Sequence, residues 1–222
     1  MKDIYESKDD AYYRQVREDL ISILPINSSQ KILEIGAGGG NTLVEIKKLK
    51  IASEVIGADI FSFPLSNQQN PLIDKFIIAN LETEDLDLPA DYFDVIIAGD
   101  ILEHLIDPWK VVEKMAKFLK NGGIFIVSVP NLREISTISK IVFGGTFNYD
   151  PAGGIMDKTH LRFFCKRNVP DLFNKAMYQI NSVRPILEVT HKESLRKTVN
   201  KFTFSLFEEF LTSQYIIVAQ KK

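Results

Sequence analysis

The sequence lacks most of the features that mark secreted and membrane-spanning proteins. It has one cysteine, Cys165, so no disulfide can form within the chain, and this suits a reducing compartment. It has no run of about 18 apolar residues, the length that a membrane-spanning helix needs. The N-terminal segment MKDIYESKDD is charged where a signal peptide would be apolar. We therefore expect a cytoplasmic protein with no membrane span.

Neither sign of charge is in large excess. The 27 basic and 29 acidic residues give a net charge of −2 and an isoelectric point of about 6.0, and no block is rich in lysine or arginine. Because proteins bind duplex nucleic acid largely by neutralising phosphates, this composition argues against a nucleic-acid partner. A chain of 222 residues, 45% of them hydrophobic, can bury one substantial core. We expect a single domain over residues 1–222.

The stretch KILEIGAGGGN, residues 31–41, organises the rest of the chain. It has the pattern of a short apolar strand, a glycine-rich turn and the start of a helix. Gly36, Gly38 and Gly40 permit positive φ and leave no side chain between the backbone and a ligand. The N-terminus of the helix suits a carboxylate or phosphate. A second strand leads to Asp59, an acid at the strand tip where a bound ribose would present its hydroxyls. The sequence thus predicts a nucleoside-binding βαβ unit.

The glycine spacing bears on which nucleoside binds. A dinucleotide fingerprint has glycines at its first, third and sixth positions, but here the sixth position is Asn41 and the glycine falls at the fifth. An NAD-linked oxidoreductase nevertheless stays open as an alternative. The pattern E-x-G-x-G-x-G, which begins at Glu34, resembles motif I of the class I S-adenosylmethionine-dependent methyltransferases.

Strands and helices alternate along the remaining chain. We expect strands at residues 54–57, 75–79, 92–98, 124–130, 179–189 and 214–219. We expect helices at residues 10–24, 42–49, 108–120, 169–178 and 192–211, and the last of these is rich in aromatic residues and has no assigned role. Asp107 and Pro108 should cap the third helix, with an exit at residues 121–123. This alternation predicts a parallel sheet with right-handed crossovers.

The run FDVIIAGDILEHLIDPWKVVEKMAKFLKNGGIFIVSVPN, residues 93–131, is similar to the region after motif I in small-molecule class I methyltransferases. The resemblance is close over residues 31–131 and loose elsewhere, and Asn121 replaces a usual proline. It implies an α/β fold: a doubly wound, Rossmann-like sheet of seven strands, mostly parallel, with an antiparallel last strand inserted between the fifth and sixth and helices on both faces.

The same resemblance implies how the domain is divided. An N-terminal helix or lid would occupy residues 1–27, and a cofactor-binding half residues 28–130. An acceptor lid would occupy residues 131–167, because a long irregular segment at this place is more often functional than a simple connector. Helices and edge strands would complete the chain over residues 168–222.

The cofactor implied is S-adenosyl-L-methionine, with S-adenosyl-L-homocysteine as the product. Asn80 would meet the adenine edge and Leu81 its face, while Tyr13 or Arg14 would close over the carboxylate. The residues expected to bind the cofactor are Glu34, Gly36, Ala37, Gly38, Gly40, Asp59, Ile60, Asn80, Leu81, Gly99, Asp100, Tyr13 and Arg14.

A hydroxyl acceptor needs its proton removed by a base or by a metal that lowers its pKa. The segment DKTHLRFF is similar to a D-x-T-H-x-R-F-F segment of methyltransferases associated with glycans and other small molecules. On this basis His160 is the candidate base and Asp157 its orienting partner. Asp100 and His104 are the other catalytic candidates.

Asp100, Glu103 and His104 form D-x-x-E-H, which resembles a metal constellation in some ubiquinone-pathway O-methyltransferases. We favour the alternative that Glu103 and His104 bond the turn and each other, so a divalent metal is possible but not expected.

The acceptor expected by family analogy is a small molecule that is methylated on oxygen. A sugar or glycan precursor comes first and a phenolic or quinone-like compound second. Nitrogen acceptors often go with an N/D-P-P-Y-type motif after the fourth strand, and here that place holds GDIL. A catalytically inactive S-adenosylmethionine-binding module remains a further alternative. The sequence leaves open whether the protein is a monomer or a homodimer.

Overall fold

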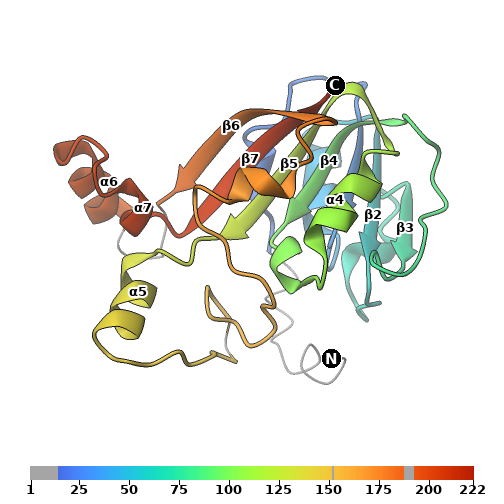
Figure 1. Ribbon diagram of the computed structural model, residues 1–222. Helices are drawn as coiled ribbons and strands as arrows, with labels where there is room; N and C mark the ends of the chain where they lie inside the picture. Colours follow the sequence, from blue (N-terminus) through green and yellow to red (C-terminus); the bar gives the residue numbers. More distant parts are fainter. Residues whose placement is uncertain (1–14, 152, 188–192) are drawn as a thin grey trace.

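A computed structural model describes residues 15–151, 153–187 and 193–222 (Figure 1). Its centre is a seven-stranded sheet in the order β3-β2-β1-β4-β5-β7-β6. β7 runs antiparallel to β5 and β6, and the pairs β1·β2, β1·β4, β2·β3 and β4·β5 are parallel. The predicted doubly wound class, including the last strand inserted beside the fifth, is confirmed. The strands are β1 Lys31–Ile35, β2 Glu54–Asp59, β3 Lys75–Ile78, β4 Phe93–Gly99, β5 Leu119–Pro130, β6 Tyr178–Ile186 and β7 Gln214–Lys221.

The central strands are apolar because both faces of the sheet are covered. Successive side chains of a strand point to opposite faces, so Ile96 packs in one core cluster while Val95 and Ile97 pack in the other. All three are buried. Such near-continuous apolar runs are typical of parallel strands in a doubly wound sheet.

The described helices are short. They are α2 Glu18–Ile21, α3 Asn41–Lys48, α4 Pro108–Met115, α5 Ile135–Val142, α6 Glu193–Phe202 and α7 Glu208–Leu211, with 3-10 turns η2 Asn67–Gln69, η3 Leu102–His104 and η4 Val169–Leu172. Asp107 caps α4 as predicted, because its side chain accepts a hydrogen bond of 3.0 Å from the Lys110 amide. Within residues 15–151, 153–187 and 193–222, each helix is too short or too polar to cross a bilayer.

Three predicted helices were wrong in extent. α4 ends at Met115 and not near residues 121–123, because Leu119 is already paired with Phe93 in the sheet. The predicted helix at 169–178 is reduced to η4, after which Phe173 takes an extended conformation. The aromatic segment divides into α6 and α7, because Phe204 and Ser205 between them have φ of 50° and 61°.

Two further segments differ from the sequence prediction. The structure describes the segment expected to be a helix at 10–24 from residue 15 onward. Only α2 is helical there, because Arg17 has non-helical φ and ψ of −88° and 72°. The expected acceptor lid contains a helix that was not predicted, α5, whose N-terminus is capped by Glu134 through the amides of Ser136 and Thr137.

Candidate active site

The glycine turn after β1 needs glycine at two of its positions. Gly36 and Gly40 have φ of 68° and 80°. A Cβ on Gly36 would lie 2.4 Å from Ile101 Cδ1, and one on Gly40 would lie 2.8 Å from Ile73 Cδ1. Glycine at these positions therefore lets the loop pack closely against Ile101 and Ile73, and α3 begins at the residue after Gly40.

Asp59 is held at the tip of β2 by this loop. Its Oδ2 accepts a hydrogen bond of 2.8 Å from the Gly38 amide, and its Oδ1 accepts one of 3.0 Å from the Phe61 amide. Burial raises the pKa of Asp59 to about 6, although these amide donors act in the opposite direction. The carboxylate is thus fixed in orientation before any ligand arrives.

A cavity of about 250 Å³ lies where the carboxyl ends of β1, β2, β3 and β4 meet, which is the usual ligand position in doubly wound sheets. Most of the predicted cofactor residues line it. They are Glu34, Gly36, Ala37, Gly38, Asp59, Ile60, Asn80, Leu81, Gly99 and Asp100. Gly40 is not among its lining residues and instead occupies the N-cap of α3. Tyr13 and Arg14 lie outside the described residues.

Arg17 also lines this cavity, and the sequence did not single it out. Its Nη1 donates to Asp100 Oδ2 over 2.6 Å and its Nη2 donates to Ser128 Oγ over 3.0 Å. Asp100 accepts two further bonds, from Ser128 Oγ at 2.8 Å and from Gln214 Nε2 at 2.9 Å. No local motif marks Arg17, because these partners come from distant parts of the chain.

A second, larger cavity of about 1220 Å³ adjoins the first. Its walls come from α5, the segment after α5, and the carboxyl end of β5. Gln15, Arg17 and Asp100 line both cavities. The two spaces therefore meet at the Arg17–Asp100 ion pair.

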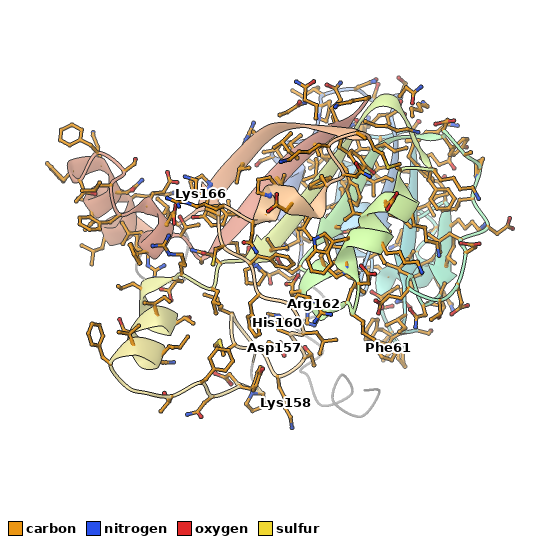
Figure 2. The ribbon with its side chains drawn as sticks, viewed as in Figure 1. Phe61, Asp157, Lys158, His160, Arg162 and Lys166 are labelled. Atoms are coloured by element: carbon orange, nitrogen blue, oxygen red, sulfur yellow. The ribbon has the colours of Figure 1, made fainter. Side chains whose placement is uncertain are left out.

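Two histidines, one from the lining of each cavity, contact each other. His104 lines the smaller cavity and His160 the larger one, and their ring centroids lie 4.7 Å apart. His160 Nδ1 is 2.9 Å from the Ile155 carbonyl oxygen. Because a carbonyl only accepts hydrogen bonds, Nδ1 carries a proton, and in the neutral ring Nε2 keeps a lone pair. Figure 2 shows His160, Asp157 and Arg162 grouped in the lid segment.

The lid is tied to the turn after β4 through Glu103. The Glu103 carbonyl accepts hydrogen bonds from the Leu161 and Arg162 amides, at 2.8 and 3.0 Å. The Asp157 carboxylate accepts from the Thr159 amide and hydroxyl, at 2.8 and 2.7 Å. Asp157 thus shapes the turn that carries His160, while the Ile155 carbonyl orients the ring.

The possible metal ligands that the structure brings together differ from the set that the sequence suggested. Ligand atoms of Glu103, His104 and His160 all lie within 4.8 Å of one another, a grouping found among the described residues. Asp100, which the sequence placed in this set, is bonded to Arg17, Ser128 and Gln214. Burial raises the pKa of Glu103 well above its ordinary value, so this carboxyl would have to lose a proton before it could bind a cation. The residue types fit a transition metal, and the expectation of no metal stays a prediction.

The buried Glu34 gives the ligand-free protein a characteristic pH dependence. Burial raises the pKa of Glu34 from 4.5 to about 8; the Arg17 charge opposes this effect and the Asp59 charge adds to it. Between these values the folded state holds a proton that the unfolded state has released. The free energy of unfolding should therefore fall as pH rises, by up to about 1.4 kcal/mol per pH unit.

Urea denaturation between pH 5 and 8 measures this slope, and we expect Glu34→Gln to make it less steep, while the buried Glu103, whose pKa is also raised, contributes the part that remains. Glu113→Gln, at an exposed position on α4, is the matched control and should keep the wild-type slope. A slope that is the same in Glu34→Gln and in the wild type would contradict the assignment.

Comparisons with known proteins identify the family to which the sequence is similar. A family model described as "Methyltransferase domain" matches residues 5–182. The human mitochondrial ubiquinone biosynthesis O-methyltransferase is 28% identical over 142 residues, which cover 58% of this chain and 38% of that protein. A ubiquinone/menaquinone biosynthesis C-methyltransferase of Vibrio parahaemolyticus is 29% identical over 131 residues, covering 56% and 51%. The matches span about half or less of these curated relatives.

Solved structures show the same fold at low sequence identity. A protein of Thermotoga maritima described as an S-adenosylmethionine-dependent methyltransferase, possible histamine N-methyltransferase, has a TM-score of 0.66, with 17% identity and 100% of both chains covered. A putative S-adenosylmethionine-dependent methyltransferase from Listeria monocytogenes has a TM-score of 0.63, also with 17% identity, covering 96% of this chain and 99% of that one.

Proposed function

Because this chain belongs to the class I S-adenosylmethionine-dependent methyltransferases, we propose that it transfers a methyl group from S-adenosyl-L-methionine to a hydroxyl of a small molecule. The observation that carries this proposal is the junction of the two cavities at Arg17 and Asp100, with His160 on the acceptor side. A donor in one cavity and an acceptor in the other would face each other there. The single cysteine supports a cytoplasmic setting for this reaction.

The residues of the smaller cavity fit the donor. The positive-φ glycines bring bare backbone to the ligand, Asp59 offers a fixed carboxylate for two ribose hydroxyls, and Asn80 and Leu81 offer an amide and an apolar face for adenine. S-Adenosylmethionine supplies a methyl group that is already activated by its sulfonium charge. The main task of the protein is therefore alignment of donor and acceptor, which can contribute about 7–11 kcal/mol to lowering the barrier.

His160 is the proposed general base. Its Nε2 would accept the acceptor's proton, while the hydrogen bond from Nδ1 to the Ile155 carbonyl keeps the ring in the required tautomer. Asp100 was also a candidate, but three donors already occupy its carboxylate. We infer that Asp100 positions Arg17 at the junction and that His104 contributes through its ring contact with His160.

The walls of the larger cavity support a flat or ring-shaped acceptor. Phe147 and Tyr149 line it, and their rings pack edge to face at 5.7 Å. The ring of Phe163, which is not itself a lining residue, has its centroid 5.8 Å from that of Phe147 and 6.5 Å from that of His160, so it connects this aromatic wall to the proposed base. Such faces suit a sugar ring, our first class, or a phenolic or quinone-like ring, our second. The relatives named for ubiquinone biosynthesis add support to the second class.

Isothermal calorimetry with S-adenosylhomocysteine and with NADH tests the donor class. We expect binding of S-adenosylhomocysteine and no detectable heat with NADH, because Asn41 stands where a dinucleotide fingerprint has its last glycine. Binding of NADH without S-adenosylhomocysteine would instead favour an NAD-linked oxidoreductase. Methyl-labelled donor offered with sugars, phenols and amines then separates an enzyme from an inactive binding module, which would bind donor and transfer nothing.

A further inference from the structure

The proposed function leaves one prominent feature of the molecule unused. Figure 1 shows α6 and α7 standing apart from the sheet, beyond the ends of β6 and β7. Phe202, Phe204 and Leu206 in this region are 78%, 94% and 78% exposed. We call the exposed apolar side chains here the apolar arm, and its members are Leu195, Val199, Phe202, Phe204, Leu206 and Phe207. Contiguous exposed apolar groups of this kind mark interaction sites.

The other side of α6 is fastened to the body of the protein. Arg196, which is only 8% exposed, forms an ion pair with Glu134 and donates a hydrogen bond of 2.8 Å to the Leu211 carbonyl. In the helix, Leu195, Val199 and Phe202 follow the i, i+4, i+7 spacing of a single stripe, and Arg196 lies to one side of it. The polar contacts thus fix which face of α6 is turned outward.

Ion pairs also attach α7 to the body of the protein, and they involve its two acidic side chains. Glu208 forms an ion pair with Lys166, which is labelled in Figure 2, and Glu209 forms one with Arg133. On the outer part of α6, Lys201 contributes an exposed cationic side chain. The described outer surface of the arm therefore combines apolar groups with positive charge.

The turn between the helices holds its apolar groups away from the protein. Phe204 and Ser205 have φ of 50° and 61°, a region that bulky side chains rarely adopt. Despite this conformation Phe204 gains no burial, since it is 94% exposed. A strained backbone that keeps a phenyl ring in water is expected where that ring has an external partner.

We propose that the apolar arm docks on the surface of an anionic lipid bilayer. Helices that lie in a membrane interface carry phenylalanine and leucine on one face and lysine on the polar face, and lysines near anionic headgroups add electrostatic attraction. A second copy of the chain would bring like charges together at this surface, whereas anionic lipid complements them. Arg196 and Glu134 also line the larger cavity, so docking would place that cavity beside the bilayer.

Co-sedimentation with vesicles tests the proposal without donor or acceptor, so its outcome is independent of the proposed function. We expect the wild-type chain to bind vesicles of phosphatidylcholine mixed with phosphatidylglycerol, and to bind pure phosphatidylcholine weakly. Phe204→Asn combined with Leu206→Ser should lower binding at least about tenfold, because it removes the two side chains best placed to insert. Asparagine tolerates the positive φ at position 204, so the turn is kept.

Two matched controls separate insertion and charge from general surface effects. Ile26→Ser with Leu65→Ser removes apolar groups that are 102% and 94% exposed elsewhere, and it should bind vesicles as the wild type does. Lys201→Glu should weaken binding to anionic vesicles, whereas Lys110→Glu on α4 should not. The proposal is overturned if the wild type does not sediment with anionic vesicles, or if the arm variant sediments equally well. It is also overturned if the arm variant instead dissociates a dimer seen by light scattering.

Discussion

Replacing Asp59 with alanine should lower the affinity for S-adenosylhomocysteine at least about a hundredfold. The carboxylate is held by the Gly38 and Phe61 amides and lines the smaller cavity. Its removal would cost two charge-assisted hydrogen bonds to ribose, each worth about 1.5–3 kcal/mol, and about 2.7 kcal/mol corresponds to a hundredfold. Isothermal calorimetry measures the loss directly.

The control for this variant is Asp87→Ala, which removes an exposed carboxylate outside the cavity and should leave the affinity unchanged. Thermal unfolding of both variants verifies that each is folded. If Asp59→Ala bound S-adenosylhomocysteine as tightly as the wild type, the ribose could not lie against this carboxylate, and the proposed donor site would be wrong.

Replacing His160 with alanine should lower turnover by about 10²–10⁴-fold, the usual contribution of a general base. The proposed donor site is the other cavity, so we expect the donor affinity to change little. Lys158→Ala is a close control, because Lys158 is exposed and only two residues away on the same segment (Figure 2). Initial rates with labelled donor and a productive acceptor give turnover, and calorimetry gives donor affinity.

The same assay in EDTA distinguishes a base from a metal ligand at His160. A base requires no cation, so wild-type turnover should persist in EDTA. Loss of activity in EDTA would indicate instead that Glu103, His104 and His160 hold a metal. Unchanged turnover in His160→Ala would show that the histidine only shapes the lid.

The sequence predicted those parts of the fold that depend on local chemistry. The glycine turn, the Asp107 cap of α4 and the apolar run of β4 are each specified by neighbouring residues. The order of the strands follows from their alternation with helices, together with the family resemblance. Most of the smaller cavity was predictable for the same reason, because its residues directly follow strands.

Features that depend on distant contacts were not predictable. Arg17 falls inside the helix expected at residues 10–24, where nothing in the pattern marks it, but in the structure its guanidinium donates to the side chains of Asp100 and Ser128. The end of α4 is decided by Leu119 joining β5, and a helix pattern alone does not show this competition. Likewise, Asp157 and His160 are close in sequence, yet the ring takes its Nδ1 partner from the backbone of Ile155.

A crystal structure with S-adenosylhomocysteine bound would test most directly whether the smaller cavity is the donor site. We expect the adenosine against the glycine turn with its ribose at Asp59, and the sulfur at the Arg17–Asp100 junction, facing the side of His160. Adenosine bound in the larger cavity, or sulfur pointing away from that junction, would contradict the proposed arrangement of donor and acceptor.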